Sequence, residues 1–187
     1  MNLDHINVKF FVQGPLSIDL QECIDEFHRW VAGRTMPELL IDVADYRHVP
    51  AGPGVVLVGL EADYAMDLAE DRPGLLYNRK APLDGTNSER LNQAVASAAA
   101  ACRVLESTFA TLKFDYSACE ISINDRAIAP NSAETYSAVE PILREFLGES
   151  LGVQEFELKH DDRDLRRRFK VAINFSQPID ASTLSVA

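Results

Sequence analysis

The feature that most constrains the fold is the alternation of short β-type segments with three longer segments of helical period. The chain opens with INVKFFV at positions 6–12, and Pro- or Gly-containing breaks bound several of the later apolar segments. The segments that predict strands are 6–12, 39–46, 55–62, 74–80, 112–116, 119–125, 153–159 and 169–175. The two around residue 53 flank a Gly-Pro-Gly corner that is typical of a hairpin.

Three segments with apolar residues at helical spacing lie between these strands, and a helix-capping residue opens each of them. The predicted caps are Ser17 for a helix through about residue 32, Asn87 or Ser88 for the second helix, and Asn131 for the third. Glu134 follows Asn131 by three residues and completes a pair that resembles a capping box. Pro141 lies inside the third segment, so we expect it to kink or split that helix.

Together these segments predict an α+β fold, with a mixed, mainly antiparallel sheet of six to eight strands and three helices. The predicted order is β-α-β-β-β-α-β-β-α-β-β. A chain of 187 residues with 47% hydrophobic residues suffices for one domain with a proper core. No stretch resembles a linker, so we expect a single α+β domain over residues 1–176 and a frayed C-terminal tail over 177–187.

Charge and hydropathy exclude two classes of partner. The net charge of −11 disfavours nucleic acid, because phosphate backbones bind basic surfaces. The local exception is the basic run 166–168 with Lys170, which we interpret as the solvated face of a strand or its entry turn. No apolar stretch approaches the roughly 18 residues of a membrane helix, and the N-terminal residues lack a signal-peptide pattern. We therefore expect neither a nucleic-acid nor a membrane partner.

The cysteines indicate a reducing compartment. Cys23, Cys102 and Cys119 lack CxxC spacing, and the first two lie on apolar faces of predicted helices. Buried free thiols are therefore expected, and with them a cytoplasmic location. No set of potential ligands has the spacing of a metal site, so we expect no metal and no cofactor.

Asp42 is the unusual residue of the second predicted strand, LLIDVADY (39–46). Burying a bare carboxylate is costly, so either an arginine such as Arg79 or Arg126 pairs with it, or it faces a pocket. Asp42 and His28, on the flank of the first predicted helix, are the weak candidates for a catalytic acid or base. Because no nucleophile or cofactor motif accompanies them, whether the chain is an enzyme stays open.

Two strand ends carry the best indication of a binding site. Tyr77-Asn78-Arg79-Lys80 and Asn124-Asp125-Arg126 each come where a predicted strand gives way to a loop and then a helix. Ligand-binding loops gather at such ends, where helix N-termini and guanidinium groups bind phosphate or carboxylate. The candidate ligand-binding residues are Asn78, Arg79, Lys80, Asp125, Arg126 and Asn131. The alternative is that these side chains only hold the loops in place through ion pairs, for example between Arg79 and Asp84.

Four motifs, EFHRW (26–30), LLIDVADYRHVPAGPGV (39–55), GLLYNRK (74–80) and NDRAIAPN (124–131), together resemble a conserved bacterial protein family of uncharacterised function. The resemblance spans the chain from the first predicted strand to the third predicted helix. It implies a free-standing bacterial cytosolic domain, and it implies no activity, cofactor or catalytic residue.

Two functions follow from these observations. The absence of an assembled nucleophile, base or metal set favours a non-catalytic cytoplasmic binding or assembly protein that contacts another protein or itself as a homo-oligomer. The alternative is an enzyme or receptor for a small anionic ligand, bearing phosphate or carboxylate, that binds at the strand ends.

Overall fold

A single antiparallel sheet forms the centre of the computed structural model, which describes residues 1–50, 52–182 and 184. Its eight strands follow the order β2-β3-β4-β5-β1-β6-β8-β7, so the first strand of the chain lies in the middle. The strands are β1 (Ile6–Val12), β2 (Leu40–Tyr46), β3 (Gly54–Gly59), β4 (Ala62–Asp67), β5 (Gly74–Arg79), β6 (Phe114–Ile123), β7 (Phe156–His160) and β8 (Phe169–Phe175).

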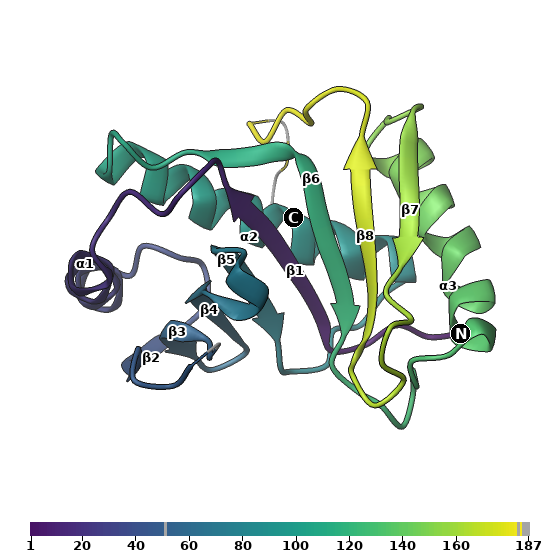
Figure 1. Ribbon diagram of the computed structural model, residues 1–187, viewed down its shortest axis with the longest axis horizontal. Helices are drawn as coiled ribbons and strands as arrows, with labels where there is room; N and C mark the ends of the chain where they lie inside the picture. Colours follow the sequence, from purple (N-terminus) through teal and green to yellow (C-terminus); the bar gives the residue numbers. More distant parts are fainter. Residues whose placement is uncertain (51, 183, 185–187) are drawn as a thin grey trace.

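The three helices are α1 (Leu20–Gly33), α2 (Asn87–Thr108) and α3 (Ala133–Glu145), and a π-helical turn, η2 (Phe146–Ser150), continues α3. The helices α2 and α3 lie behind the sheet in Figure 1, while α1 packs against β2 and β3. The opposite face, which we call the open face, carries none of the three helices described above; a 3-10 turn, η1 (Ala69–Asp71), lies over it between β4 and β5. No helix among the described residues has the length and hydropathy needed to cross a membrane.

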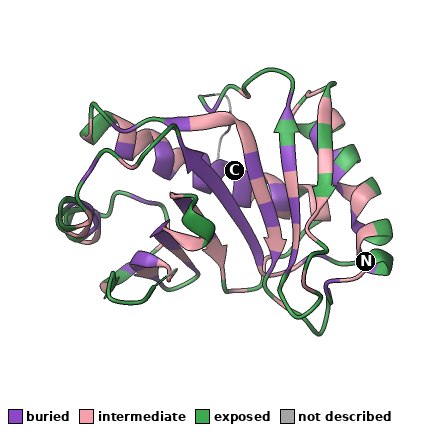
Figure 2. Ribbon diagram, in the orientation of Figure 1, coloured by how far each residue is buried: buried purple, intermediate pink, exposed green. Residues whose placement is uncertain are grey.

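Strand alternation determines which side chains reach each face. On β1, Val8 and Phe10 are fully buried on the helix side, and Lys9 points to the open face between them. Every residue of β1 is nonetheless buried, as the purple strand in Figure 2 shows. The polar side chains of β1 are therefore covered by other groups on the open face, and those groups form the site described below.

The predicted α+β class is confirmed, with three helices and one sheet. Two strand predictions need correction. The segment 55–62 is not one strand, because the chain turns after Gly59 and returns as β4; a Cβ on Gly59 would lie only 2.3 Å from the carbonyl oxygen of Ala62. The segments 112–116 and 119–125 belong to one strand, β6, whose pairing with β1 shifts register between Phe10 and Phe11.

The helix caps also differ from the prediction. Asp19 caps α1, Thr86 caps α2 and Ser132 caps α3, each through a side-chain oxygen that accepts a backbone N–H. Pro141 does not split α3, which continues to Glu145 and then widens into η2. The missing N–H of a proline removes one hydrogen bond, and packing of Leu143 and Phe146 in the core keeps the segment helical.

The cysteines and the tail can be located directly. Cys23, Cys102 and Cys119 are buried and free, as predicted, and burial raises the pKa of Cys23 and Cys119 to about 12. Within the predicted tail, the backbone N–H of Ile179 donates to Tyr116 and Ala181 is buried, so this part is packed rather than frayed. The prediction for 183 and 185–187 lies outside the described residues.

Candidate functional site

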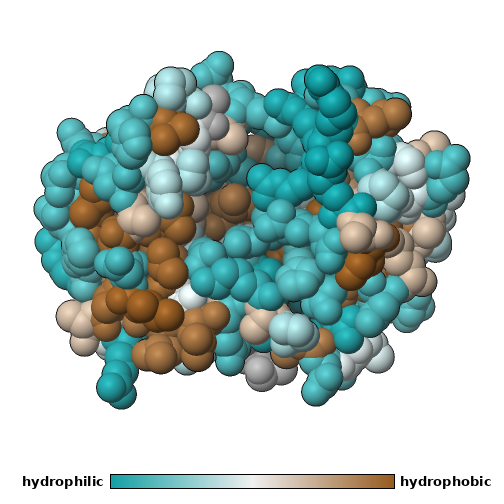
Figure 3. Space-filling model, turned by 90° about the horizontal axis from the view of Figure 1, so that it is seen from below, coloured by the Kyte–Doolittle hydropathy of each residue, from teal (hydrophilic) through white to brown (hydrophobic). Residues whose placement is uncertain are grey.

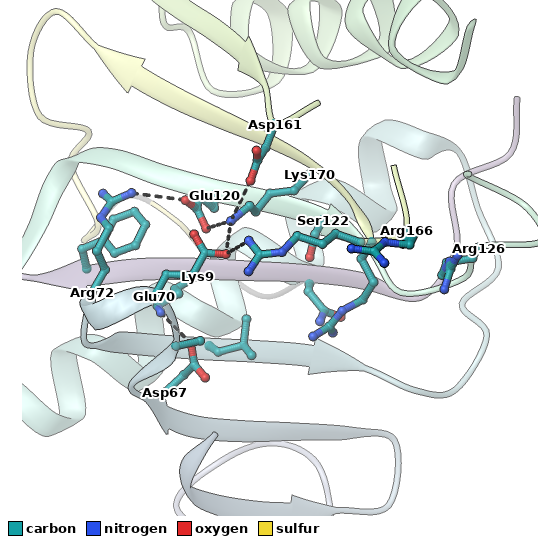
Figure 4. A pocket seen from close by; sticks show the side chains of 16 residues that line it. Lys9, Asp67, Glu70, Arg72, Glu120, Ser122, Arg126, Asp161, Arg166 and Lys170 are labelled. Carbon is teal, nitrogen blue, oxygen red and sulfur yellow. Dashed lines mark hydrogen bonds and ion pairs between the residues drawn. The ribbon is translucent and has the colours of Figure 1, made fainter. Parts of the chain in front are cut away.

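A pocket of about 520 Å³ lies on the open face. Its floor comes from β5, β1, β6 and β8, and its walls come from η1 on one side and the β7–β8 connection on the other (Figure 4). We call it the sheet-face pocket. The charged residues that line it are Lys9, Asp67, Glu70, Arg72, Glu120, Arg126, Asp161, Arg166, Arg167, Arg168 and Lys170. Seven are basic and four are acidic, the reverse of the balance in the whole chain.

Strand pairing brings the polar side chains of the floor together. Asn7 on β1 lies opposite Asn78 on β5 and Ser122 on β6, and Ser122 in turn lies opposite Lys170 on β8. Directly opposed residues of antiparallel strands point to the same face of a sheet. Asn7, Ser122 and Lys170 therefore form a polar row across three strands of the floor, and Asn78 continues this row on β5 outside the residues that line the pocket. Lys9 and Glu120 form a second polar pair two residues further along β1.

A buried ion pair lies beneath one end of the pocket. Lys9 Nζ is 2.6 Å from Asp67 Oδ2, and both side chains are 8% exposed. The ammonium group also lies 5.5 Å from the centroid of the Phe11 ring, which Arg72 covers at 3.6 Å. Two buried charges in this position are favourable only while both are present, because either one alone would be desolvated and uncompensated.

Lys170 is the centre of a larger charge cluster. Its Nζ lies 3.1 Å from Glu70 Oε1, 3.3 Å from Glu120 Oε2 and 3.5 Å from Asp161 Oδ2. Burial acts to lower the pKa of Lys170, but the charges of Glu120 and Glu70 outweigh it and raise that pKa. The hydrogen bond from Arg163 lowers the pKa of Asp161, and Lys170 adds to this effect. The contacts of the cluster thus favour the ionised forms of Lys170 and Asp161.

Glu70 connects the two walls of the pocket. From η1 its carboxylate reaches Arg167 at 2.7 Å and Arg163 at 3.4 Å, both in the β7–β8 connection. Burial acts to raise the pKa of Glu70, but Lys170 and Arg167 together lower it. Glu70 adopts φ 62° and Asp71 adopts φ 54°, values that are uncommon for residues other than glycine. Such backbone conformations persist where surrounding contacts impose them, and these ion pairs provide those contacts.

The opposite end of the pocket is lined by basic side chains, Arg126 and Arg166 among them (Figure 4), and by Arg168. Arg166 pairs with Asp164 at 3.0 Å, and Arg168 donates to Asn124 Oδ1 at 3.3 Å. In the described part of the chain, no carboxylate oxygen lies within 4 Å of the guanidinium nitrogens of Arg126 or Arg168. The pKa of Asp164 is lowered chiefly by its hydrogen bond with Arg166, while Arg126 acts on it from further away.

Asn131 supports the β7–β8 wall instead of capping a helix or binding a ligand. It is 2% exposed, and its Nδ2 donates to the backbone oxygens of Asp161 at 2.9 Å and Asp164 at 3.2 Å. Its Oδ1 must then accept from His160 Nε2, 2.7 Å away, so His160 carries its proton on Nε2. The His160 ring stacks on Tyr136 at 5.1 Å.

The structure brings together one pair from the two predicted strand-end motifs. Asn124 Nδ2 donates to Asn78 Oδ1 at 3.3 Å across β1, so equivalent asparagines of the two motifs meet. Arg126 lines the sheet-face pocket, whereas Arg79 lines a much smaller cavity elsewhere. The guanidinium of Arg79 donates to Glu61 at 3.0 Å and to the backbone oxygen of Ala81 at 2.8 Å. Arg79 therefore has the contacts of a residue that holds its own loop in place.

Two further predicted ligand residues have internal partners as well. Lys80 Nζ lies 2.7 Å from Asp63 Oδ1 and donates to the backbone oxygen of Gly59 at 2.6 Å. Asp125 Oδ1 accepts the backbone N–H of Ala127 at 2.8 Å, which closes the turn after β6. Neither residue lines the sheet-face pocket.

The expectation that Asp42 is buried with an arginine, or faces a pocket, is wrong. Asp42 is exposed on β2, the edge strand of the sheet, and its Oδ1 accepts the backbone N–H of Val43 at 2.8 Å. A strand at the edge of a sheet has a neighbouring strand on one side only. The apolar residues around Asp42 in sequence therefore do not imply that Asp42 is buried. His28 is likewise exposed on α1. Neither candidate for acid–base chemistry lines the sheet-face pocket.

Several pocket residues were missed by the sequence interpretation, above all Asn7, Lys9 and Glu120. Each lies between apolar residues of a central strand, in the segments INVKFFV and CEISI. A polar side chain at every second position of a central strand indicates a polar open face, and this signal could have identified them.

Comparison with known proteins leaves the site to be interpreted from its own chemistry. No family model matches the chain, and neither the curated proteins nor the solved structures contain a match. The resemblance to a conserved bacterial family stays a prediction. Among the described residues, no group of three or more His, Cys, Asp or Glu side chains could hold a metal ion.

Proposed function

We propose that this protein binds a small anionic ligand in the sheet-face pocket. The observation that carries the proposal is the excess of basic side chains at one end of the pocket, where Arg126 and Arg168 lack carboxylate partners within 4 Å among the described residues. All four acidic residues that line the pocket are paired with Lys or Arg. The unpaired charge in the pocket is therefore positive.

Three physical arguments support an anion at this end. Guanidinium groups offer forked donors that match phosphate and carboxylate oxygens. On a chain with a net charge of −11, a basic cavity is the place where an anion is attracted while the rest of the surface repels it. The volume of about 520 Å³ also lies in the range typical of small-molecule sites.

The site supports binding better than catalysis. Ser122 is the one hydroxyl-bearing side chain among the described residues of the pocket lining, and neither histidine nor cysteine accompanies it there. An activated nucleophile needs a base within hydrogen-bonding reach, and the lysines and carboxylates near Ser122 are engaged with each other. We therefore propose a receptor or carrier role. We place it in the bacterial cytoplasm, which agrees with the three buried free thiols.

Anion binding can be tested by thermal unfolding of the full chain with inorganic phosphate or citrate at constant ionic strength. A ligand at a hundredfold excess over its Kd should stabilise the native state by about 2.7 kcal/mol, which a higher Tm reports. The double variant Arg126→Gln/Arg168→Gln should lose this gain, while Arg144→Gln, an exposed arginine paired with Glu140 on α3, should retain it. Arg79→Gln should also retain it, because Arg79 lines a different cavity.

An anion-dependent Tm that survives in the Arg126→Gln/Arg168→Gln variant would contradict the proposal. If Arg79→Gln is as stable as wild type in plain buffer but its Tm no longer rises with the anion, the anion binds at the strand-end site predicted from the sequence rather than in the sheet-face pocket.

Assembly through protein contacts, the function that the sequence favoured, stays a prediction. Leu39, Ile41 and Leu60 are 58%, 52% and 60% exposed near the β2–β3 end of the sheet, and Figure 3 shows apolar surface gathered on that side. The side chain of Asp42 accepts a hydrogen bond from the backbone N–H of Val43, so this N–H cannot pair with a strand of a second copy. We therefore expect a second copy to contact Leu39, Ile41 and Leu60 rather than to extend the sheet. Sedimentation velocity should then show a dimer that Ile41→Lys converts to monomer; a monomer at all concentrations would contradict this.

A further inference from the structure

The central polar residue of the pocket, Asn7, is buried without a partner for its side-chain oxygen. Asn7 is 1% exposed, and its Oδ1 has no hydrogen-bond partner among the described residues. It lines the sheet-face pocket between Asn78 and Ser122. Buried polar atoms are nearly always hydrogen-bonded, and each exception calls for an explanation. An unbonded oxygen in the lining of a pocket indicates a donor that comes from outside the chain.

A hydroxyl group is the donor that fits Asn7 best. A hydroxyl both donates and accepts, so it can bond the amide whichever way the amide turns about its last torsion angle, whereas an ammonium can only donate. The neighbouring groups suit a hydroxylated molecule as well. Ser122 faces Asn7 across β1 and β6, and Glu120 and Lys9 form the next pair along the same two strands. They offer donors and acceptors side by side.

The anionic part of the ligand belongs at the basic end of the pocket. Asn124, which accepts from Arg168, follows Ser122 by two residues, a distance of roughly 7 Å along an extended chain. Arg126 and Arg166 line the same end. A phosphate monoester carries close to two negative charges and three free oxygens, so it engages more than one guanidinium group, whereas one guanidinium can engage both oxygens of a carboxylate.

We propose that the ligand is a phosphate monoester of a polyhydroxy compound, that is, a sugar phosphate or polyol phosphate. Its phosphate binds Arg126 and Arg168, and one of its hydroxyl groups donates to Asn7 Oδ1. This inference rests on the proposed function, because it specifies the ligand of the same pocket.

Isothermal titration calorimetry of the full chain with glucose 6-phosphate, glycerol 1-phosphate, methyl phosphate and citrate tests the inference. At least one of the two hydroxylated phosphates should bind about tenfold more tightly than methyl phosphate, the effect of one well-placed hydrogen bond in a buried site. In Asn7→Val this ratio should fall to about one. Asn7→Ser, which shortens the side chain and keeps it polar, should lower the ratio as well. Asn174→Ser, an exposed asparagine of β8 outside the pocket lining, should leave it unchanged.

The possible failures can be told apart. If all phosphates bind equally, or if both Asn7 variants keep the wild-type ratio, the role of Asn7 is overturned while anion binding stands. If citrate binds more tightly than every phosphate, the phosphate assignment is overturned and the proposed function again stands. If none of the four anions binds, the inference and the proposed function fail together.

Discussion

Replacing Lys9 with methionine is expected to lower the free energy of unfolding by about 3–5 kcal/mol. Methionine fills much of the same space, so the loss comes chiefly from Asp67, which stays 5% exposed under the pocket floor without its cation. Asp67→Leu should cost a similar amount, because it leaves the ammonium of Lys9 in the same position. Urea unfolding at neutral pH, with midpoints and slopes compared between variants, measures both losses.

The double variant Lys9→Met/Asp67→Leu separates the ion pair from its parts. Replacing both charges of a buried pair by apolar groups is often neutral or stabilising, so we expect the double variant to recover most of the stability that either single variant loses. Losses that simply add would show that the two side chains do not interact. Recovery would also indicate that the pair is retained for the pocket rather than for stability.

Local patterns in the sequence were sufficient to predict the fold class. The boundaries of β1 (Ile6–Val12) and β8 (Phe169–Phe175) agree with the predicted segments, because regular alternation and clear breaks define them. The strand β4 was missed because the predicted strand 55–62 ran past the turn at Gly59 and the residues after it were left unassigned; its carboxylates, Asp63 and Asp67, have cationic partners in the structure. Partners distant in sequence overrode the local preference here.

The candidate site was only partly predictable for the same reason. Arg126 was chosen from its place at a strand end, and it does line the pocket. The equivalent position of Arg79 carries no such role, because Glu61 lies beside it across the β4 turn. Glu70 lies 100 residues from Lys170 in sequence, and no local pattern connects them. The sequence indicated which residues lie at the strand ends, and the order of the strands decided which of them share a pocket.

Replacing Lys170 with methionine is expected to cost about 3 kcal/mol at neutral pH and to change how stability depends on pH. The folded-state pKa values of Glu70 and Asp161 are lowered in the wild type. Their contribution is therefore present above the unfolded-state pKa values and is lost as pH falls through the folded-state values. Wild-type stability should accordingly decrease on acidification below about pH 4.5, the ordinary pKa of a glutamate.

The stability of the Lys170→Met variant should depend less on pH than that of the wild type. Without Lys170, burial and the charge of Asp161 act against a smaller set of cations at Glu70, of which Arg167 and Arg163 remain, so the folded-state pKa of Glu70 should move up toward its unfolded-state value. A smaller depression of the folded-state pKa means that the carboxylate contributes less stability at neutral pH and that less is lost as pH falls. The stability difference between wild type and variant should thus be largest near pH 7 and shrink toward pH 4. Urea midpoints at pH 7, 6, 5 and 4 measure it, with Lys159→Met, an exposed lysine of β7, as the matched control. A difference independent of pH would show that Lys170 acts through packing rather than through charge.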